Sequence, residues 1–140
     1  MSLSAFLAQN AERIDNVKYV ASERFKDENG NPMEWEIRAI TAKQNKEIQN
    51  QCMKYTVVPG KRAQQRRELD LIEYQTKLAV ACTVFPDLNN AELQNSYGVM
   101  GADVLLDTML TPGELTDYVV EVQGICGFES MDKLVEDAKN

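Results

Sequence analysis

The chain has 140 residues, contains no histidine and carries a formal net charge of −7. This length suits one domain with an ordinary hydrophobic core. Without histidine, Ser/His and Cys/His nucleophile pairs and His-containing metal sites are excluded. The negative charge disfavours non-specific binding to nucleic-acid phosphates. We therefore predict a protein that is not an enzyme, needs no cofactor and binds no nucleic acid.

The cysteines and the hydropathy pattern indicate the cellular compartment. Cys52, Cys82 and Cys126 are odd in number and far apart, which predicts free thiols that are buried or half-buried. No run of roughly 18 uncharged apolar residues is present, and the first residues do not form a secretion signal. We expect a cytoplasmic protein without a membrane span.

Residues 2–11 are predicted to form a short helix. Ser2 is a suitable N-cap, and helical spacing places Leu3, Phe6 and Leu7 on one side. Two interpretations remain open: a helix that packs or docks, and a terminus that rests on the core.

Residues 17–39 alternate between apolar and polar side chains, which predicts two half-buried strands joined as a hairpin. A three-residue loop, 28–30, sets Phe25 opposite Met33 and keeps the apolar faces together, with Gly30 in the left-handed conformation. The two-residue turn typical of an Asn-Gly pair mixes the faces. The sequence therefore favours the three-residue loop.

Thr41 and Gln44 have the spacing of a capping box, which predicts a helix over about 42–53. Pro59-Gly60 then fits the centre of a type II turn. The only basic cluster of the sequence follows: Lys61, Arg62, Arg66 and Arg67. Because no aromatic residues are interleaved with it, we favour a solvated mobile loop over about 55–67 rather than a nucleic-acid patch. If this loop has a function, an acidic partner surface is its natural target.

Apolar residues at steps of three and four predict a central core helix over about 68–84, ended by Pro86. They are Leu71, Tyr74, Leu78, Ala81 and Phe85.

Further helices are predicted in the C-terminal third. Asn89 caps a short helix that Gly98 ends, and an apolar face follows over residues 102–110. The string 111–114 (TPGE) starts another helix. Ser130 caps a last helix whose apolar residues are Met131, Leu134, Val135 and Ala138.

Together these elements predict an α+β fold within a single domain, residues 1–140. An N-terminal helix and β-hairpin (1–41) pack with a mainly helical C-terminal part (42–140). The hairpin is too small to be stable alone, and its exposed edge favours self-association.

Several long strings closely resemble the XkdN-like phage tail assembly chaperones of contractile-tailed phages and PBSX-like defective prophages. They span nearly the whole chain: residues 2–7 (SLSAFL), 24–32 (RFKDENGNP), 34–38 (EWEIR), 81–89 (ACTVFPDLN), 95–102 (NSYGVMGA) and 109–114 (MLTPGE). Residues 55–67 are the least family-like part.

The resemblance implies a non-enzymatic chaperone that binds the tape-measure protein and assists assembly of the tail tube protein around it. It also implies a place in the bacterial cytoplasm during tail assembly and absence from the mature virion. The alternative is a structural tail or baseplate-associated subunit retained in the particle. The residues that we predict to contact a partner are Trp35 and three apolar residues of the C-terminal helices: Leu105, Met109 and Val119. For Trp35 the alternative interpretation is a residue of the hydrophobic core. Full burial of those three in a closed core would remove them from a binding groove.

Overall fold

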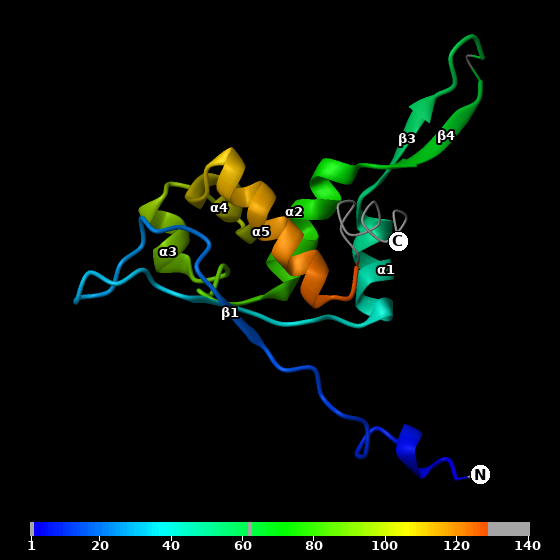
Figure 1. Ribbon diagram of the computed structural model, residues 1–140. Coiled ribbons are helices and arrows are strands. Elements are labelled where there is room, and N and C mark those ends of the chain that lie inside the picture. Colours follow the sequence, from blue (N-terminus) through cyan, green and yellow to red (C-terminus); the bar gives the residue numbers. More distant parts are fainter. Residues whose placement is uncertain (1, 62, 129–140) are drawn as a thin grey trace, which may run out of the picture.

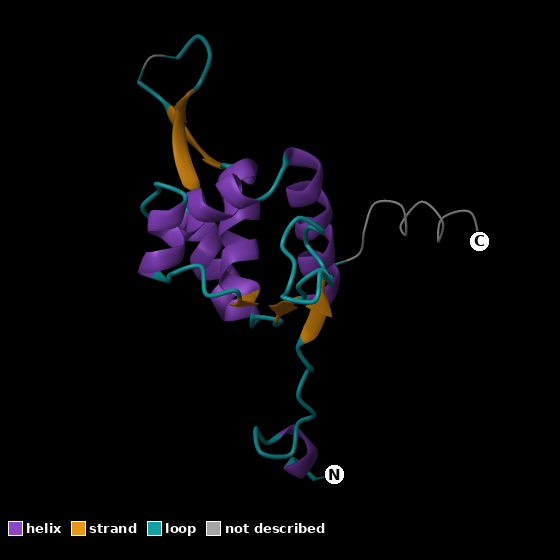
Figure 2. Ribbon diagram, turned by 90° about the vertical axis from the view of Figure 1, so that its left-hand side faces the viewer, coloured by secondary structure: helices purple, strands orange, loops and turns teal. Residues whose placement is uncertain are grey.

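A computed structural model describes residues 2–61 and 63–128 of the chain and confirms the predicted α+β class (Figure 1). Helices form the main body, and two small antiparallel sheets lie at its edges (Figure 2). In chain order the elements are a 3-10 turn at Ser4–Phe6, β1 (Val17–Tyr19), β2 (Trp35–Ile37), α1 (Ala42–Gln51), β3 (Met53–Val57), β4 (Gln65–Leu69), α2 (Leu71–Cys82), β5 (Thr83–Phe85), α3 (Ala91–Ser96), α4 (Ala102–Met109) and α5 (Pro112–Ile125).

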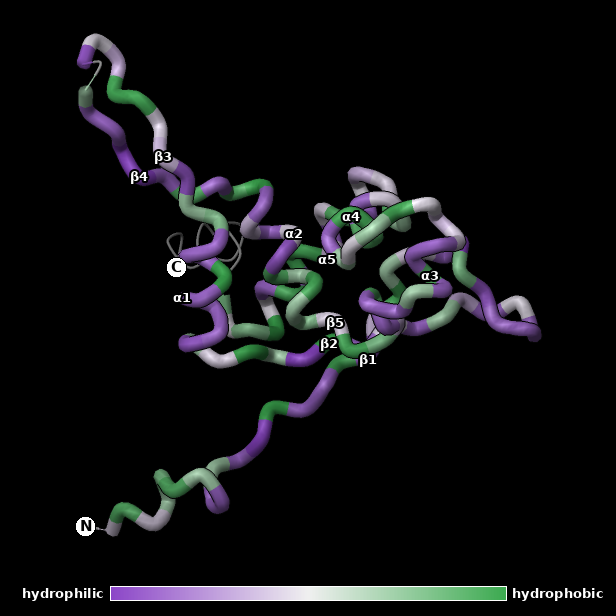
Figure 3. The backbone as a smooth tube through the Cα atoms, turned by 180° about the vertical axis from the view of Figure 1, so that it is seen from behind, coloured by the Kyte–Doolittle hydropathy of each residue, from purple (hydrophilic) through white to green (hydrophobic). Residues whose placement is uncertain are grey.

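Helix α2 is the centre of the core, as predicted, and contacts α1, α4 and α5. Its Leu78, Ala79 and Cys82 are fully buried. The Tyr74 hydroxyl donates a hydrogen bond to Asn45 Oδ1 of α1 at 2.5 Å. In Figure 3 hydrophobic residues are frequent along α2 and α5, whereas α1 is mostly hydrophilic. Burial of these apolar surfaces is the main stabilising contribution to such a fold.

The predicted helix over 68–84 was too long at both ends. The helix begins at Leu71, after strand β4, and ends at Cys82; Thr83–Phe85 form strand β5. This strand pairs antiparallel with β2, giving the order β1-β2-β5. β-Branched and aromatic residues favour a strand where a neighbouring edge is available, so β2 overrides the local helical period.

The loop of the N-terminal hairpin was predicted correctly. The Asp27 amide donates to the Asn31 carbonyl at 2.8 Å, which leaves a three-residue loop, and Gly30 is left-handed at φ +82°. Farther from the loop the register differs from the prediction, because Tyr19 pairs with Trp35. Phe25 lies opposite Met33 as predicted, since the Met33 amide donates to the Phe25 carbonyl at 2.7 Å. Residues 20–24 leave the ladder, and they do not continue the predicted strand.

The N-terminal segment does not form the predicted helix over 2–11. Only Ser4–Phe6 form a single 3-10 turn, and residues 2–16 are exposed throughout. The segment extends away from the body in two perpendicular views (Figures 1 and 2). Leu3 and Phe6 have no core partner here, which explains why their periodicity alone did not stabilise a helix.

Residues 55–67, predicted as a mobile loop, include most of a β-hairpin. Strands β3 and β4 pair over five residues each, from Met53 opposite Leu69 to Val57 opposite Gln65. The predicted Pro59-Gly60 turn is confirmed, since the Lys61 amide donates to the Val58 carbonyl at 3.0 Å and Gly60 has φ +77°. Strand β4 was missed because four of its five residues are polar or charged. Strand β3 does alternate, with apolar residues at 53, 55 and 57, but residue 53 was assigned to the preceding helix and the rest to the loop.

The predicted capping box of Thr41 with Gln44 at α1 is confirmed. The predicted helix start at residues 111–114 is also confirmed, and there Thr111 and Glu114 form a capping box at α5. The cap of α3 is Asn90 and not Asn89. The helix predicted after Ser130 lies outside the described residues.

Candidate partner-binding groove

The four residues predicted to contact a partner lie in the core. Trp35, Leu105, Met109 and Val119 are 2%, 0%, 4% and 7% exposed. The Trp35 ring packs edge-on against Tyr118 at a centroid distance of 5.2 Å. In this conformation a partner cannot reach Leu105 or Met109, so the core interpretation describes them. Of the four, Val119 borders a hollow on the surface.

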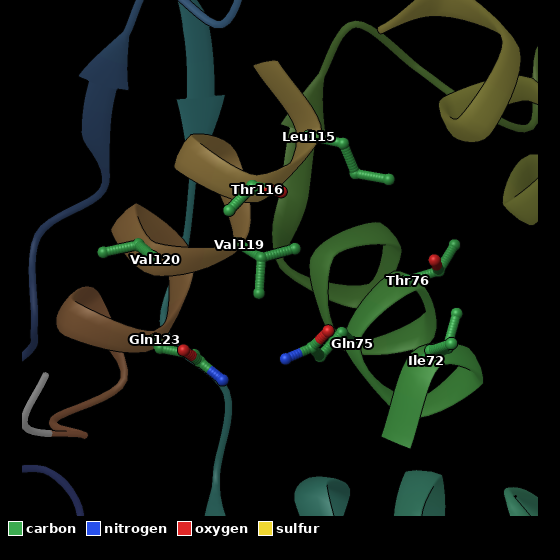
Figure 4. A pocket seen from close by; sticks show the side chains of 8 residues that line it. All are labelled: Ile72, Gln75, Thr76, Leu115, Thr116, Val119, Val120 and Gln123. Carbon is green, nitrogen blue, oxygen red and sulfur yellow. The ribbon is translucent and has the colours of Figure 1, made fainter. Parts of the chain in front are cut away.

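This hollow is a groove between α2 and α5, with a volume of about 150 Å³. Its residues recur at helical steps of three and four, which aligns one row from each helix along the groove. Figure 4 shows the two rows: Ile72, Gln75 and Thr76 from α2, and Leu115, Thr116, Val119, Val120 and Gln123 from α5. Leu115 projects towards the α2 side, and Gln75 projects towards α5.

The groove is lined by four apolar and four polar residues, and two of the aliphatic side chains on its rim are open to a partner. Ile72 is 81% exposed and Val120 is 51% exposed, while Val119 is buried below them. The hydroxyl of Thr76 donates to Asp107 Oδ1 at 3.2 Å and is therefore satisfied within the fold. Exposed aliphatic side chains around a shallow floor suit the apolar face of a helix.

Carboxylates border the groove on the α4 side. A second hollow, which shares Ile72 and Thr76 with the groove, is also lined by Asp70, Glu73, Asp103 and Asp107. Two of the four are ion-paired: Asp103 with Lys77 at 2.8 Å and Glu73 with Lys54 at 3.1 Å. The hydrogen bond to Asp103 raises the pKa of Lys77, which keeps that amine charged. Four carboxylates beside two amines leave this border acidic, so it favours a cationic partner.

The cysteines are free, with Cys52 and Cys82 buried and Cys126 half-buried, as predicted. The Sγ atoms of Cys82 and Cys126 are 3.7 Å apart. Burial raises the pKa of the Cys82 thiol, so the sulfur is protonated at neutral pH and is a weak nucleophile. Within residues 2–61 and 63–128, no three His, Cys, Asp or Glu side chains come together in a way that could hold a metal ion.

Sequence reasoning missed Ile72 and Val120, which form the accessible rim. Each lies one position from a residue of the predicted apolar stripe, Leu71 and Val119. Two adjacent apolar residues on a helix point in directions about 100° apart, so they indicate an apolar surface wider than one packing face. These adjacent apolar residues were the one feature of the sequence that indicated an additional apolar surface. They do not identify which face of the helix remains uncovered.

Three comparisons with known proteins agree with one another. The family model described as "Phage XkdN-like tail assembly chaperone protein, TAC" matches residues 3–139. The Bacillus subtilis (strain 168) phage-like element PBSX protein XkdN is 25% identical over 140 residues, covering 99% of this chain and 93% of that protein. YqbN of the same strain, an uncharacterised protein, is 28% identical with the same coverage.

The fold also has a solved counterpart. A crystal structure of the protein YqbN superposes with a TM-score of 0.77, at 24% identity, and covers 92% of this chain and 98% of its own. None of the described helices is long and apolar enough to cross a membrane. Because the family model spans almost the entire sequence, the chain belongs to the XkdN-like family of phage tail assembly chaperones.

Proposed function

We propose that this chaperone is not an enzyme, and that it binds the tape-measure protein of its phage or prophage and assists assembly of the tail tube around it. The observation that carries the proposal is the α2–α5 groove, which has an exposed aliphatic rim and an acidic border. An amphipathic helix with basic residues beside its apolar row has the complementary shape and charge. On this proposal the protein acts in the host cytoplasm and leaves before the virion is mature.

The groove is small, and this suits a transient chaperone. A helix laid along it buries a few aliphatic side chains, at about 25 cal/mol per Å² of apolar surface removed from water. Most of that gain is offset by the entropy lost on association. While it is bound, the apolar face of the segment is covered and cannot aggregate. Because the net affinity is low, a tube subunit can displace the chaperone.

The first test is co-expression with the tape-measure protein from the same gene cluster, followed by a pull-down and a solubility assay. Capture of a partner that is insoluble alone supports the proposal. If the partner neither binds nor gains solubility, and the protein instead co-purifies with mature tails, the structural-subunit alternative replaces it.

A substitution at the rim tests the groove itself. Ile72→Gln places an uncharged polar side chain among the aliphatic ones and leaves the charge of the acidic border unchanged, and we expect tape-measure affinity to fall by about tenfold or more, equivalent to 1.4 kcal/mol. The helix tolerates the change because residue 72 is exposed and glutamine is a good helix former.

The matched control is Met100→Gln, which changes an even more exposed apolar residue outside the groove. We expect this variant to bind the tape-measure protein as the wild type does, with both affinities measured by isothermal titration calorimetry. Equal losses in the two variants would show that exposed apolar surface in general, and not the groove, determines binding.

A further inference from the structure

The β3–β4 hairpin projects from the body and has two unpaired edges (Figures 1 and 2). In the part of the chain that the structure describes, no third strand joins this sheet. Exposed edges of this kind present main-chain donors and acceptors to another strand. A two-stranded ribbon alone is only marginally stable in water.

The hydrogen-bond pattern shows which amides face outward. The Asp70 amide donates to the Cys52 carbonyl at 2.8 Å, and the Val58 amide donates to the Gln64 carbonyl at 3.0 Å. Antiparallel ladders alternate between bonded and non-bonded pairs. Residues 53, 55 and 57 of β3 therefore direct their main-chain groups away from β4.

The side chains at these three positions are apolar and share one face of the ribbon. They are Met53, Tyr55 and Val57, and the last two are 70% and 61% exposed. Hydrophobic residues on an open edge strand are a liability unless another surface covers them.

We propose that two copies of this chain pair β3 with β3 across a two-fold axis at Tyr55, which joins two hairpins into one four-stranded antiparallel sheet. In this register Tyr55 lies opposite Tyr55 of the second copy, and Val57 lies opposite Met53 of the second copy. All three positions on each strand have outward main-chain groups, so the pairs bond in the standard antiparallel way. The apolar side chains then form one continuous row on one face.

The charge distribution favours a second copy as the partner. Residues 53–69 contain five basic residues and one acidic residue, so the rest of the chain carries a net charge of −11. A two-fold axis brings the basic tip of each hairpin beside the base of the other. There Asp70 and Glu73 begin α2, and the last turn of α1 contains no basic residue to offset its negative end.

The opposite edge is less suitable. Pairing β4 with itself about its central residue places Arg67 directly opposite Arg67 of the second copy. Like charges that face each other across a ladder are destabilising. The β3 edge has no such conflict.

The experiment uses the purified protein alone, so its outcome does not depend on the tape-measure protein. Sedimentation velocity between about 5 and 500 µM, a range that brackets micromolar association, should show a monomer–dimer equilibrium that weakens as salt increases. Val57→Pro removes one outward amide without removing a bond inside the hairpin, and we expect at least a tenfold weaker dimer. Gln65→Pro, directly across the ladder on the β4 edge, is the matched control and should dimerise as the wild type does.

A cross-link tests the register. Tyr55→Cys places two thiols opposite each other at the axis, and oxidised glutathione should join them as a disulfide while it is reduced to two glutathione thiols. Thr56→Cys, on the other face, should not cross-link; both variants retain the three native cysteines. A monomeric wild type over the whole range, or equal losses in the two proline variants, overturns the proposal. A monomer in which Val57→Pro instead abolishes tape-measure binding would assign this edge to that partner.

Discussion

Arg24 and Glu114 connect the N-terminal part of the chain to the helical body. One guanidinium nitrogen of Arg24 donates to the Met109 carbonyl at 2.7 Å and to Glu114 Oε1 at 2.8 Å. The Thr111 amide donates to the same carboxylate oxygen at 2.9 Å. The hydrogen bond from Arg24, and then those from Ser22 and the Thr111 amide, lower the pKa of Glu114 to about 2.

This shift makes stability depend on pH in the acid range. The pKa of Glu114 is lower in the folded state than in the unfolded chain, where it is about 4.3, so the ionised carboxylate stabilises the fold above that value. The contribution is lost as pH falls from about 4.3 towards 2. Glu114→Gln keeps the capping box but removes the charge. We expect a lower urea midpoint at pH 7 and a smaller loss of stability on acidification.

Glu28→Gln is the control for that substitution, because Glu28 lies exposed in the hairpin loop. Its urea midpoints at pH 7 and pH 3 should match those of the wild type. A wild-type pH dependence in Glu114→Gln would show that other carboxylates account for the acid sensitivity.

At the scale of elements, the start of α5 depends on its cap. The Thr111 hydroxyl accepts a hydrogen bond from the Glu114 amide, and Pro112 occupies the first turn. Thr111→Ala removes this acceptor, and we expect the free energy of unfolding to fall by about 1 kcal/mol. Chemical denaturation measures the change.

Thr108→Ala provides the comparison for this cap. The Thr108 hydroxyl only bonds back to the Val104 carbonyl within α4, an interaction that contributes little to helix stability. Its unfolding free energy should stay within about 0.5 kcal/mol of the wild type, as for most surface substitutions. Equal effects at the two threonines would argue that Thr111 does not act as a cap.

Short sequence motifs correctly predicted those features whose hydrogen bonds join residues close together in the sequence. The boxes at Thr41 and Thr111 and the left-handed Gly30 each satisfy main-chain groups within a few residues. Strand β5 could not be predicted in this way. Its residues continue a helical period, and only the distant edge of β2 converts them to a strand.

The candidate site was less predictable than the fold. Apolar periodicity identified Leu105 and Met109 as hydrophobic surface, but it cannot show that α4 turns both towards the core. The open rim depends on the spacing of α2 and α5 in space. Ile72 became a candidate only after the packing of those helices was known.

At the scale of the whole molecule, the N-terminal segment is an appendage to the folded body. Residues 2–16 are exposed, and Figure 3 shows hydrophobic stretches along the segment at a distance from the core. We expect a variant that lacks residues 2–14 to melt within about 2 °C of the full chain, since a loss of 1 kcal/mol would shift a domain of this size by several degrees. Differential scanning calorimetry tests this expectation. A larger decrease would mean that the segment packs on the body.

The position of Trp35 determines what an optical experiment can detect. It is the only tryptophan of the chain, and it lies where the three-stranded sheet meets Tyr118 of α5. Its fluorescence emission therefore reports the solvation of that junction alone. Tryptophan emission recorded during thermal unfolding will follow the separation of the sheet from the helices. It will not detect changes that are confined to the N-terminal segment or to the tip of the β3–β4 hairpin.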